Sequence, residues 1–394
     1  MLLPFADGRG MTSSAPGSRP IAEVALVALN VNNPSGVPRY TRALAGAVDA
    51  VSPEFPDLRV RVITTRPGAA TLSLRNLNVT TVRPRRAVPF GGASRLALEQ
   101  VAGLTARADI LHFFDVMGPL LRPRRTFVAT FHDASIVHAT VAHFGPARRP
   151  YKRAVYGLML PRAARVVAVS EFARQEAVSQ FRIDPAKVAV IRSGPGLTAE
   201  FGAVVADGDD VDPGMTNFLL FVGNLTTSKN LPFLIEAYGR ANVDADLVLA
   251  GSRGAGHDDV TAAIARSPQR ARIRVVESPT DRDVDLLYKS ARALVAPSRY
   301  EGFGFTPLEA MSRGCAVLAS DIPAHRENAG AGAALLELEP ERWADAIRRV
   351  VNDDEYVETL RLRGLEAVSS FSWERTAREL CELFRECVAR ASVR

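Results

Sequence analysis

Two glutamates flank a glycine-rich turn in the segment Glu301-Gly-Phe-Gly-Phe-Thr-Pro-Leu-Glu309. Glycines let a ligand approach the backbone closely, and Pro307 is suited to the first position of a helix. The free N–H groups at such a helix start form an anion site suited to a diphosphate. Carboxylates do not bind phosphates, so Glu301 and Glu309 are interpreted as acceptors for sugar and ribose hydroxyls.

Glu309 also has a structural interpretation. Thr306-Pro-Leu-Glu309 has the spacing of a capping box, in which the glutamate bonds a backbone N–H of its own helix. Glu301 fits no such structural motif and is therefore the sharper marker of a site.

Further polar residues follow predicted strands of the N-terminal half. His132 and Asp133 come directly after the strand TFVATF, where the carboxyl end of a parallel sheet faces a ligand site. His112 ends the preceding predicted strand and has a weaker claim to a role. A structural, hydrogen-bonded histidine remains the alternative for His132. His138 and His143, spaced i, i+5, are interpreted as surface residues.

Gly36 and Arg39 occupy the first predicted strand-to-helix turn. The glycine would admit a phosphate, and Arg39 would bind an anionic acceptor. A helix-start glycine and an exposed arginine are the alternatives.

Short apolar runs alternate with amphipathic segments from residue 21 onward, which is the pattern of a parallel α/β sheet. The series is interrupted at residues 201–216, which are rich in Gly and Asp, and then begins again at residue 217. We therefore predict two doubly wound domains that face a central cleft, and a C-terminal helix that packs across both. The predicted boundaries are a disordered leader (1–20), an N-terminal domain (21–200), a linker (201–216), a C-terminal domain (217–371) and a returning helix (372–394).

Composition indicates a globular protein, with 47% hydrophobic and 23% charged residues in 394. The three cysteines have no C-x-x-C spacing, which argues against disulfides and zinc and favours a cytoplasmic location. Residues 1–200 hold 26 Lys and Arg against 13 Asp and Glu, whereas residues 201–394 hold 23 against 30. The basic half would suit peripheral contact with the anionic inner face of a membrane, and an arginine-rich solvated surface is the alternative, favoured for any single basic cluster. No motif supports nucleic-acid binding.

The segment SRYEGFGFTPLEAMSRGCAVLASDIPAHRE resembles the Glu-x7-Glu signature of retaining glycosyltransferases of family four, which have the GT-B fold. Further similar segments occur in the family's order along most of the chain. They are SGVPRYTRAL, TFHDASIV, RVVAVSEFAR, FVGNLTTSKNLPFLIEAY, DLVLAGS, LLYKSARALVAPS and FSWERTARELCELF.

The resemblance implies a role for each matching residue. Lys229 would neutralise the donor diphosphate, Glu309 would bind the ribose, and Glu301 and His132 would contact the transferred sugar near the reacting centre. Backbone amides of Phe303, Gly304 and Phe305 would hold phosphate and sugar oxygens. Outside this context, Lys229 would be interpreted as a solvated loop lysine.

One position departs from the family's pattern. Asn224 stands where the family usually has a second basic residue, so the phosphate clamp is expected to be weaker.

The resemblance also implies the reaction. A nucleoside-diphosphate sugar, with GDP-mannose favoured over UDP-sugars, would donate a hexose to a glycan, a lipid-linked or a small-molecule acceptor. Neither glutamate is an evident nucleophile, so front-face transfer with retention is expected, and no metal. The strings Asp207-x-Asp209, Asp281-x-Asp283 and Asp283-x-Asp285 have no glycine-rich phosphate partner.

Two features of the sequence fit other functions. LVLAGSRGAG followed by Glu277 imitates the dinucleotide fingerprint of an NAD-dependent oxidoreductase, but it follows the second strand of its domain and has the wrong glycine order. A nucleotide-sugar-binding protein without turnover is suggested only by Asn224.

Overall fold

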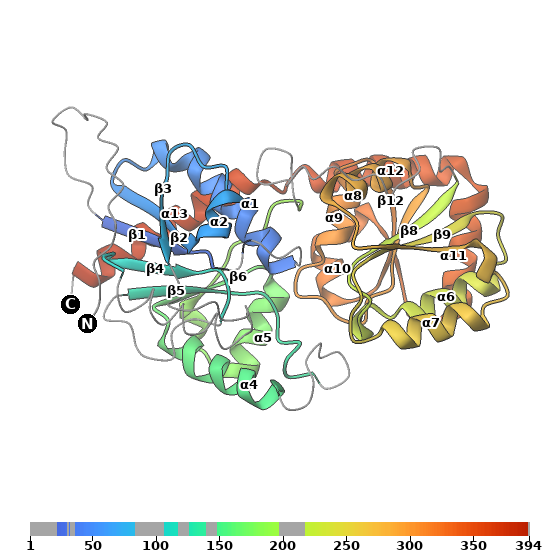
Figure 1. Ribbon diagram of the computed structural model, residues 1–394, viewed down its shortest axis with the longest axis horizontal. Coiled ribbons are helices and arrows are strands. Elements are labelled where there is room, and N and C mark those ends of the chain that lie inside the picture. Colours follow the sequence, from blue (N-terminus) through green and yellow to red (C-terminus); the bar gives the residue numbers. More distant parts are fainter. Residues whose placement is uncertain are drawn as a thin grey trace.

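A computed structural model describes residues 22–29, 31, 36–82, 106–116, 126–138, 148–196 and 217–392. The predicted leader, the predicted linker and two arginine clusters, at 83–86 and 122–125, lie outside the described residues. Two α/β domains lie side by side, with the N-terminal half of the chain in one and the C-terminal half in the other (Figure 1).

The N-terminal domain is built on a seven-stranded parallel sheet in the order β3-β2-β1-β4-β5-β6-β7. Its strands are β1 (Ala22–Val27), β2 (Leu58–Thr65), β3 (Asn78–Val82), β4 (Ile110–Phe113), β5 (Thr126–Phe131), β6 (Arg165–Ala168) and β7 (Val188–Val190). The central strands are apolar because helices cover both faces of a parallel sheet.

Its described helices are α1 (Gly36–Val51), α2 (Arg66–Ala70), α4 (Arg148–Met159) and α5 (Glu171–Phe181). Helix α5 begins after Ser170, whose hydroxyl accepts a hydrogen bond from the N–H of Ala173 at 2.9 Å.

The C-terminal domain is built on a six-stranded parallel sheet in the order β10-β9-β8-β11-β12-β13. Its strands are β8 (Phe218–Val222), β9 (Asp246–Gly251), β10 (Ile273–Glu277), β11 (Ala293–Ala296), β12 (Ala316–Ser320) and β13 (Ala334–Leu336). Its helices are α6 (Leu231–Ala241), α7 (His257–Arg266), α8 (Asp281–Ser290), α9 (Phe305–Met311), α10 (Pro323–Asn328), α11 (Pro340–Asn352) and α12 (Asp354–Val368).

The prediction of two doubly wound parallel-sheet domains is confirmed. The strands β3 and β13 were not predicted. Strand β3 is a polar and largely exposed edge strand, and β13 has only 3 residues, so neither carries a strong hydrophobic pattern.

The C-terminal helix α13 (Trp373–Ser392) leaves the second domain and runs back along the first (Figure 1). It packs on α1, and Arg385 of α13 bonds Asp57. Trp373, at its start, stacks on Phe305 of the C-terminal domain and donates from Nε1 to the carbonyl of Gly196 at 2.5 Å. The helix thus contacts both domains, as predicted.

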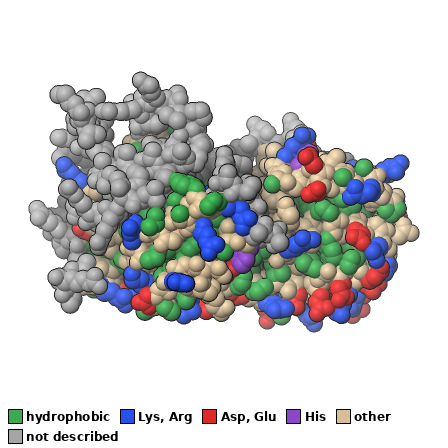
Figure 2. Space-filling model, turned by 90° about the horizontal axis from the view of Figure 1, so that it is seen from below, with side chains coloured by type: hydrophobic (Ala, Val, Ile, Leu, Met, Phe, Trp, Pro, Cys, Tyr) green, Lys and Arg blue, Asp and Glu red, His purple; other side chains and the backbone are tan. Residues whose placement is uncertain are grey.

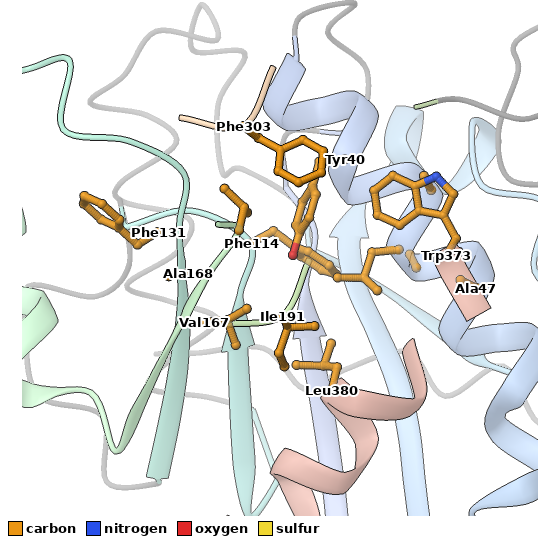
Figure 3. Packing of buried hydrophobic residues seen from close by; sticks show 14 of the residues in the cluster. Tyr40, Ala47, Phe114, Phe131, Val167, Ala168, Ile191, Phe303, Trp373 and Leu380 are labelled. Atoms are coloured by element: carbon orange, nitrogen blue, oxygen red, sulfur yellow. The ribbon is translucent and has the colours of Figure 1, made fainter. Parts of the chain in front are cut away.

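Apolar side chains from both domains meet in one buried cluster. Phe303 from the C-terminal domain lies beside Tyr40 of α1, with Trp373 next to them (Figure 3). In the described part of the chain, no helix combines the length and the apolar character needed to cross a bilayer.

Candidate active site

A cleft of about 510 Å³ is lined by residues of both domains, a size typical of small-molecule sites. It lies at the carboxyl ends of strands from both sheets, as expected for two facing parallel sheets. Every residue predicted for the site lines it: Gly36, Arg39, His132, Asp133, Asn224, Lys229, Glu301, Phe303, Gly304, Phe305 and Glu309.

Glu301 and Lys229 form an ion pair inside the cleft. The Lys229 Nζ lies 2.5 Å from Glu301 Oε1, and Ser298 donates to the same oxygen at 2.7 Å. Burial alone would raise the pKa of Glu301, but Lys229, His325 and these hydrogen bonds outweigh it and lower that pKa. Glu301 is therefore a carboxylate at neutral pH, suited to accept hydrogen bonds from hydroxyl groups.

Glu309 does not cap its helix, so the capping-box interpretation is wrong. Its Oε2 accepts a hydrogen bond from the Tyr288 hydroxyl at 3.0 Å, and its Oε1 lies 4.0 Å from an Arg39 guanidinium nitrogen. Helix α9 begins at Phe305, so position 309 lies past its first turn. The carboxylate points toward the cleft rather than toward its own backbone.

The turn before α9 depends on glycine. Gly304 has a φ of 85°, in the left-handed region, and as the residue before the helix it offers no side chain to cap it. Pro307 is the third helical residue, so its predicted first position is wrong by two residues. The first N–H groups of a helix have no partner within that helix, and Phe303, Gly304 and Phe305 at this helix start line the cleft.

His132 reaches the cleft from the end of β5. Its Nε2 lies 2.8 Å from the carbonyl oxygen of Phe114, and its ring meets the Tyr40 ring edge-on at 4.7 Å. These contacts fix the orientation of the imidazole at the cleft wall.

Arg39 was predicted on the acceptor side, but its partners belong to the C-terminal domain. Its guanidinium forms a short ion pair with Asp281, the first residue of α8, and it approaches Glu309. Arg39 therefore bridges the two domains beside Glu309. Asp133 also lines the cleft, where its side chain accepts from the N–H of Ser135 at 2.8 Å.

The other histidines differ in environment. His112 is fully buried in β4, with Nε2 2.9 Å from Thr130 Oγ1, so it is a core residue. His138 keeps 36% of its side chain exposed, and its Nε2 lies 2.7 Å from Glu176 Oε1, so it is a partly exposed residue with a carboxylate partner. His143 lies outside the described residues.

The aspartates of the D-x-D strings already have partners. Asp281 pairs with Arg39, Asp283 caps α8 through Thr280, and Asp285 pairs with Lys289 and Arg313. Asp207 and Asp209 lie outside the described residues. Within the described ranges, no cluster of three or more His, Cys, Asp or Glu side chains could hold a metal ion.

The glycines that imitate a dinucleotide fingerprint serve packing. A Cβ on Gly251 would lie 1.9 Å from the carbonyl oxygen of Gly223, so the β9 end needs glycine to pass the β8 end. Glu277 is exposed and bonds Arg253 through both oxygens. The three cysteines are buried free thiols.

Sequence reasoning missed several cleft residues. Lys152 and Tyr156 of α4, together with Asp115, line the N-terminal side, and Gly196 and Trp373 line the side next to Glu309. A Cβ on Gly196 would lie 2.1 Å from Glu309 Cγ. These residues follow no local motif, so only the fold brings them to the cleft.

Comparisons with known proteins agree with this geometry. Residues 209–365 match the family described as glycosyl transferases group 1, and residues 34–195 match glycosyltransferase family 4. The chain is 29% identical over 258 residues to the O-antigen chain mannosyltransferase B of Escherichia coli, covering 63% of this chain and 67% of that one. It is 28% identical over 283 residues to a D-inositol 3-phosphate glycosyltransferase of Kineococcus radiotolerans, and the match covers 65% of this chain and 64% of that one.

A third relative and two solved structures extend the comparison. A GDP-mannose:cellobiosyl-diphosphopolyprenol alpha-mannosyltransferase of Xanthomonas oryzae is 26% identical over 313 residues, covering 74% and 78%. A sucrose-phosphate synthase from Thermosynechococcus elongatus shares the fold, with a TM-score of 0.71, 21% identity, and coverage of 93% and 99%. Anabaena HepE in complex with UDP-glucose does so with a TM-score of 0.69, 18% identity, and coverage of 93% and 100%. The chain belongs to glycosyltransferase family 4 and is a glycosyltransferase of the GT-B fold.

Proposed function

We propose that the enzyme transfers mannose from GDP-mannose, with retention of the anomeric configuration, to a glycan or lipid-linked acceptor. The observation that carries the proposal is the Lys229–Glu301 pair, which lies in the same cleft as Glu309 and the uncapped start of α9. This arrangement combines acceptors for hydroxyls with donors for phosphates.

The donor would lie with its diphosphate between Lys229 and the N–H groups of residues 303–305. Lys229 supplies a positive charge, and the uncapped N–H groups supply hydrogen bonds. Glu301 would then accept from hydroxyls of the sugar and Glu309 from those of the ribose. Asn224 is exposed and neutral at the same wall, so Lys229 carries most of the phosphate charge in this proposal.

Front-face transfer fits the charges in the cleft. The bond from the anomeric carbon to the diphosphate breaks, the acceptor oxygen bonds to that carbon on the same face, and its proton passes to the leaving phosphate. Covalent retention would need a carboxylate free to attack. Glu301 is instead bound to Lys229 and Ser298, which supports a role in holding the sugar. His132, which also lines the cleft, would contact the sugar near the reacting carbon.

The donor identity rests on the relatives. Two of them are named mannosyltransferases, one with GDP-mannose in its name, which supports mannose and guanine. UDP-glucose is the competing donor, because the HepE complex of the same fold contains it. Position 224 itself holds an uncharged asparagine rather than a basic residue.

The acceptor would enter from the N-terminal side, where Lys152, Tyr156 and Ile136 line the cleft. Tyr151 and Leu158 of the same helix, α4, are exposed hydrophobic residues near Arg153. Figure 2 shows Lys and Arg among hydrophobic side chains on this face of the domain. This mixture supports peripheral contact with an anionic membrane at its cytoplasmic face, where a lipid-linked acceptor would lie.

A donor panel tests the proposal. Thermal unfolding is followed with GDP, UDP, GDP-mannose and UDP-glucose, because a ligand of the native state raises the melting temperature. We expect the largest rise with GDP and GDP-mannose, and α-mannoside products with lipid-linked acceptors. Nucleotide binding without transfer to any such acceptor would instead favour a binding protein without turnover.

A further inference from the structure

The hydroxyl of Tyr300 joins the two domains directly beside Glu301. Tyr300 belongs to the loop after β11, and its hydroxyl donates a short hydrogen bond to Glu176 Oε2 of α5. It also accepts from the N–H of Ala134, at 2.8 Å, in the loop that carries His132. A phenylalanine would keep the ring but could make neither bond.

Three side chains of the N-terminal domain, Phe172, Glu176 and His138, contact Tyr300. Phe172 and Glu176 lie one turn apart on α5, and the Phe172 ring meets the Tyr300 ring edge-on at 5.9 Å. His138 places its ring 5.1 Å from the Tyr300 ring and its Nε2 2.7 Å from Glu176 Oε1. Glu176 itself is only 7% exposed, so these partners supply the hydrogen bonds that water would otherwise make.

Burial, together with the carboxylates of Asp133 and Glu176, raises the pKa of Tyr300. The phenol therefore stays protonated and remains a donor to Glu176. The Tyr300 hydroxyl thus acts both as a donor, to Glu176, and as an acceptor, from Ala134.

The two loops that Tyr300 joins carry the residues assigned to the sugar. Ser170, ahead of α5, donates to the carbonyl oxygen of Gly302 at 2.6 Å. A Cβ on Gly302 would lie 1.9 Å from the carbonyl oxygen of His132. The backbone after Glu301 is thus in direct contact with the backbone of His132, and any shift between the domains changes the separation of these two residues.

We propose that Tyr300, bound to Glu176 and the amide of Ala134, is a positioning residue that locks the Glu301 loop against the His132 loop for sugar transfer. The latch consists of Tyr300, Glu176 and His138. The inference rests on the proposed roles of Glu301 and His132, and it adds a residue that touches neither donor nor acceptor.

Two conservative variants test the latch, Tyr300→Phe and Glu176→Gln. Turnover is measured as release of GDP from GDP-mannose and of UDP from UDP-glucose, in parallel, and binding of GDP and UDP is measured by calorimetry. We expect kcat to fall about ten- to a hundredfold in each variant, because a misplacement of about 1 Å at a reacting centre has effects of that size. Affinity for the nucleoside diphosphate should stay within threefold, since Lys229 and Glu309 remain.

The double variant distinguishes a shared latch from two separate defects. If Tyr300 and Glu176 act as one unit, Tyr300→Phe combined with Glu176→Gln should lower kcat no further than the stronger single variant. Tyr356→Phe is the matched control, because Tyr356 lies on α12 and packs under Arg349, away from the cleft. It should keep full turnover.

A distance measurement needs no substrate. Spin labels on Asp345 of α11 and Arg61 of β2, both remote from the latch, report the separation of the domains in the ligand-free protein. The latch predicts a broader and longer distance distribution in Tyr300→Phe than in wild type or Tyr356→Phe.

Three results would overturn the latch. The first is a kcat of Tyr300→Phe within threefold of wild type. The second is a loss of nucleoside-diphosphate affinity in Tyr300→Phe as large as its loss of kcat, and the third is a distance distribution in Tyr300→Phe that equals that of wild type. Failure of the proposed function looks different. Wild type would then turn over neither donor, or Glu301→Gln would keep its activity, and the distance measurement would still judge the latch.

Discussion

Lys229 and Glu301 illustrate how one ion pair can stabilise two charges inside the cleft. Their side chains are 19% and 17% exposed, so each charge is largely withdrawn from water and needs the other. A donor diphosphate would give Lys229 a second anionic partner while sugar hydroxyls donate to Glu301. The charges of Lys229 and Glu301 therefore balance each other within the cleft.

Lys229→Ala should lower turnover by roughly a hundred- to thousandfold, which corresponds to about 3–4 kcal/mol of transition-state stabilisation. The reason is the loss of the positive charge that faces the developing charge on the leaving diphosphate. Steady-state release of GDP or UDP measures the effect. Lys289→Ala, which removes an exposed lysine paired with Asp285, is the control and should remain active. Near-normal activity of Lys229→Ala would remove this residue from the mechanism.

His112 makes the stability of the enzyme sensitive to acid. Burial, and then the nearby His132, lower the pKa of His112 from 6.5 to about 3, so the folded state keeps the imidazole neutral. The unfolded chain takes up a proton below about pH 6.5. The stabilisation is therefore complete above that pH and is lost progressively as the pH falls toward 3.

His112→Gln should reduce this dependence while retaining a hydrogen bond to Thr130. Wild type is expected to lose about 1.4 kcal/mol more per pH unit than the variant between pH 6 and 4. Urea unfolding at a series of pH values measures the difference. Parallel curves for the two proteins would show that His112 is protonated in the folded state.

The residue types of the site could be predicted from sequence, but their partners could not. Glu301, Lys229 and His132 follow strands or loops whose order indicates one cleft. The contact of Arg39 with Asp281 was missed because the two residues are 242 positions apart and no local pattern links them. The Glu176–Tyr300 contact was missed for the same reason, with 124 positions between its members.

At the scale of elements, the loop before α9 and the loop after β5 act as one unit. The capping-box pattern predicted Thr306 as the cap and Pro307 as the first helical residue, whereas left-handed Gly304 starts the helix at Phe305, two residues earlier, and leaves Glu309 free for the cleft. Strong hydrophobic runs made the central strands predictable. The short β13 depends on pairing with β12 rather than on its own sequence.

Gly302→Ala should separate these two loops. Its added Cβ would meet backbone at 1.9 Å, and backbone cannot rotate away as a flexible side chain does. We expect transfer to fall at least tenfold while both domains remain folded, as judged by circular dichroism, because a small displacement at the reacting centre is enough.

Gly157→Ala on α4 is the matched control, since among the described residues, apart from the backbone of its own helix, no atom lies within 4 Å of the Cβ it would add. That variant should be as active as wild type, and slightly more stable because alanine favours a helix. Equal activity of the two alanine variants would contradict the close packing at Gly302.

At the scale of the whole molecule, the two sheets make one site only because α13 and the loops hold them together. Glu327 of α10 accepts hydrogen bonds from the N–H groups of Glu171 and Phe172, at 2.6 and 2.9 Å, at the start of α5. A carboxylate at a helix N-terminus is favourable, so this contact adds to the Tyr300 latch and the Arg39 bridge. Two domains and their facing cleft followed from the repeated strand–helix pattern, but the contacts between the two domains did not.

In the proposed mechanism the two glutamates hold the donor sugar and ribose rather than act as an acid and a base. Calorimetry of GDP binding, together with mannose transfer from GDP-mannose in the same preparation of Glu301→Gln, tests this role. We expect GDP affinity to be retained or improved, because Lys229 is released, while transfer falls at least a hundredfold. Transfer near the wild-type rate, or loss of GDP binding equal to the loss of transfer, would contradict it.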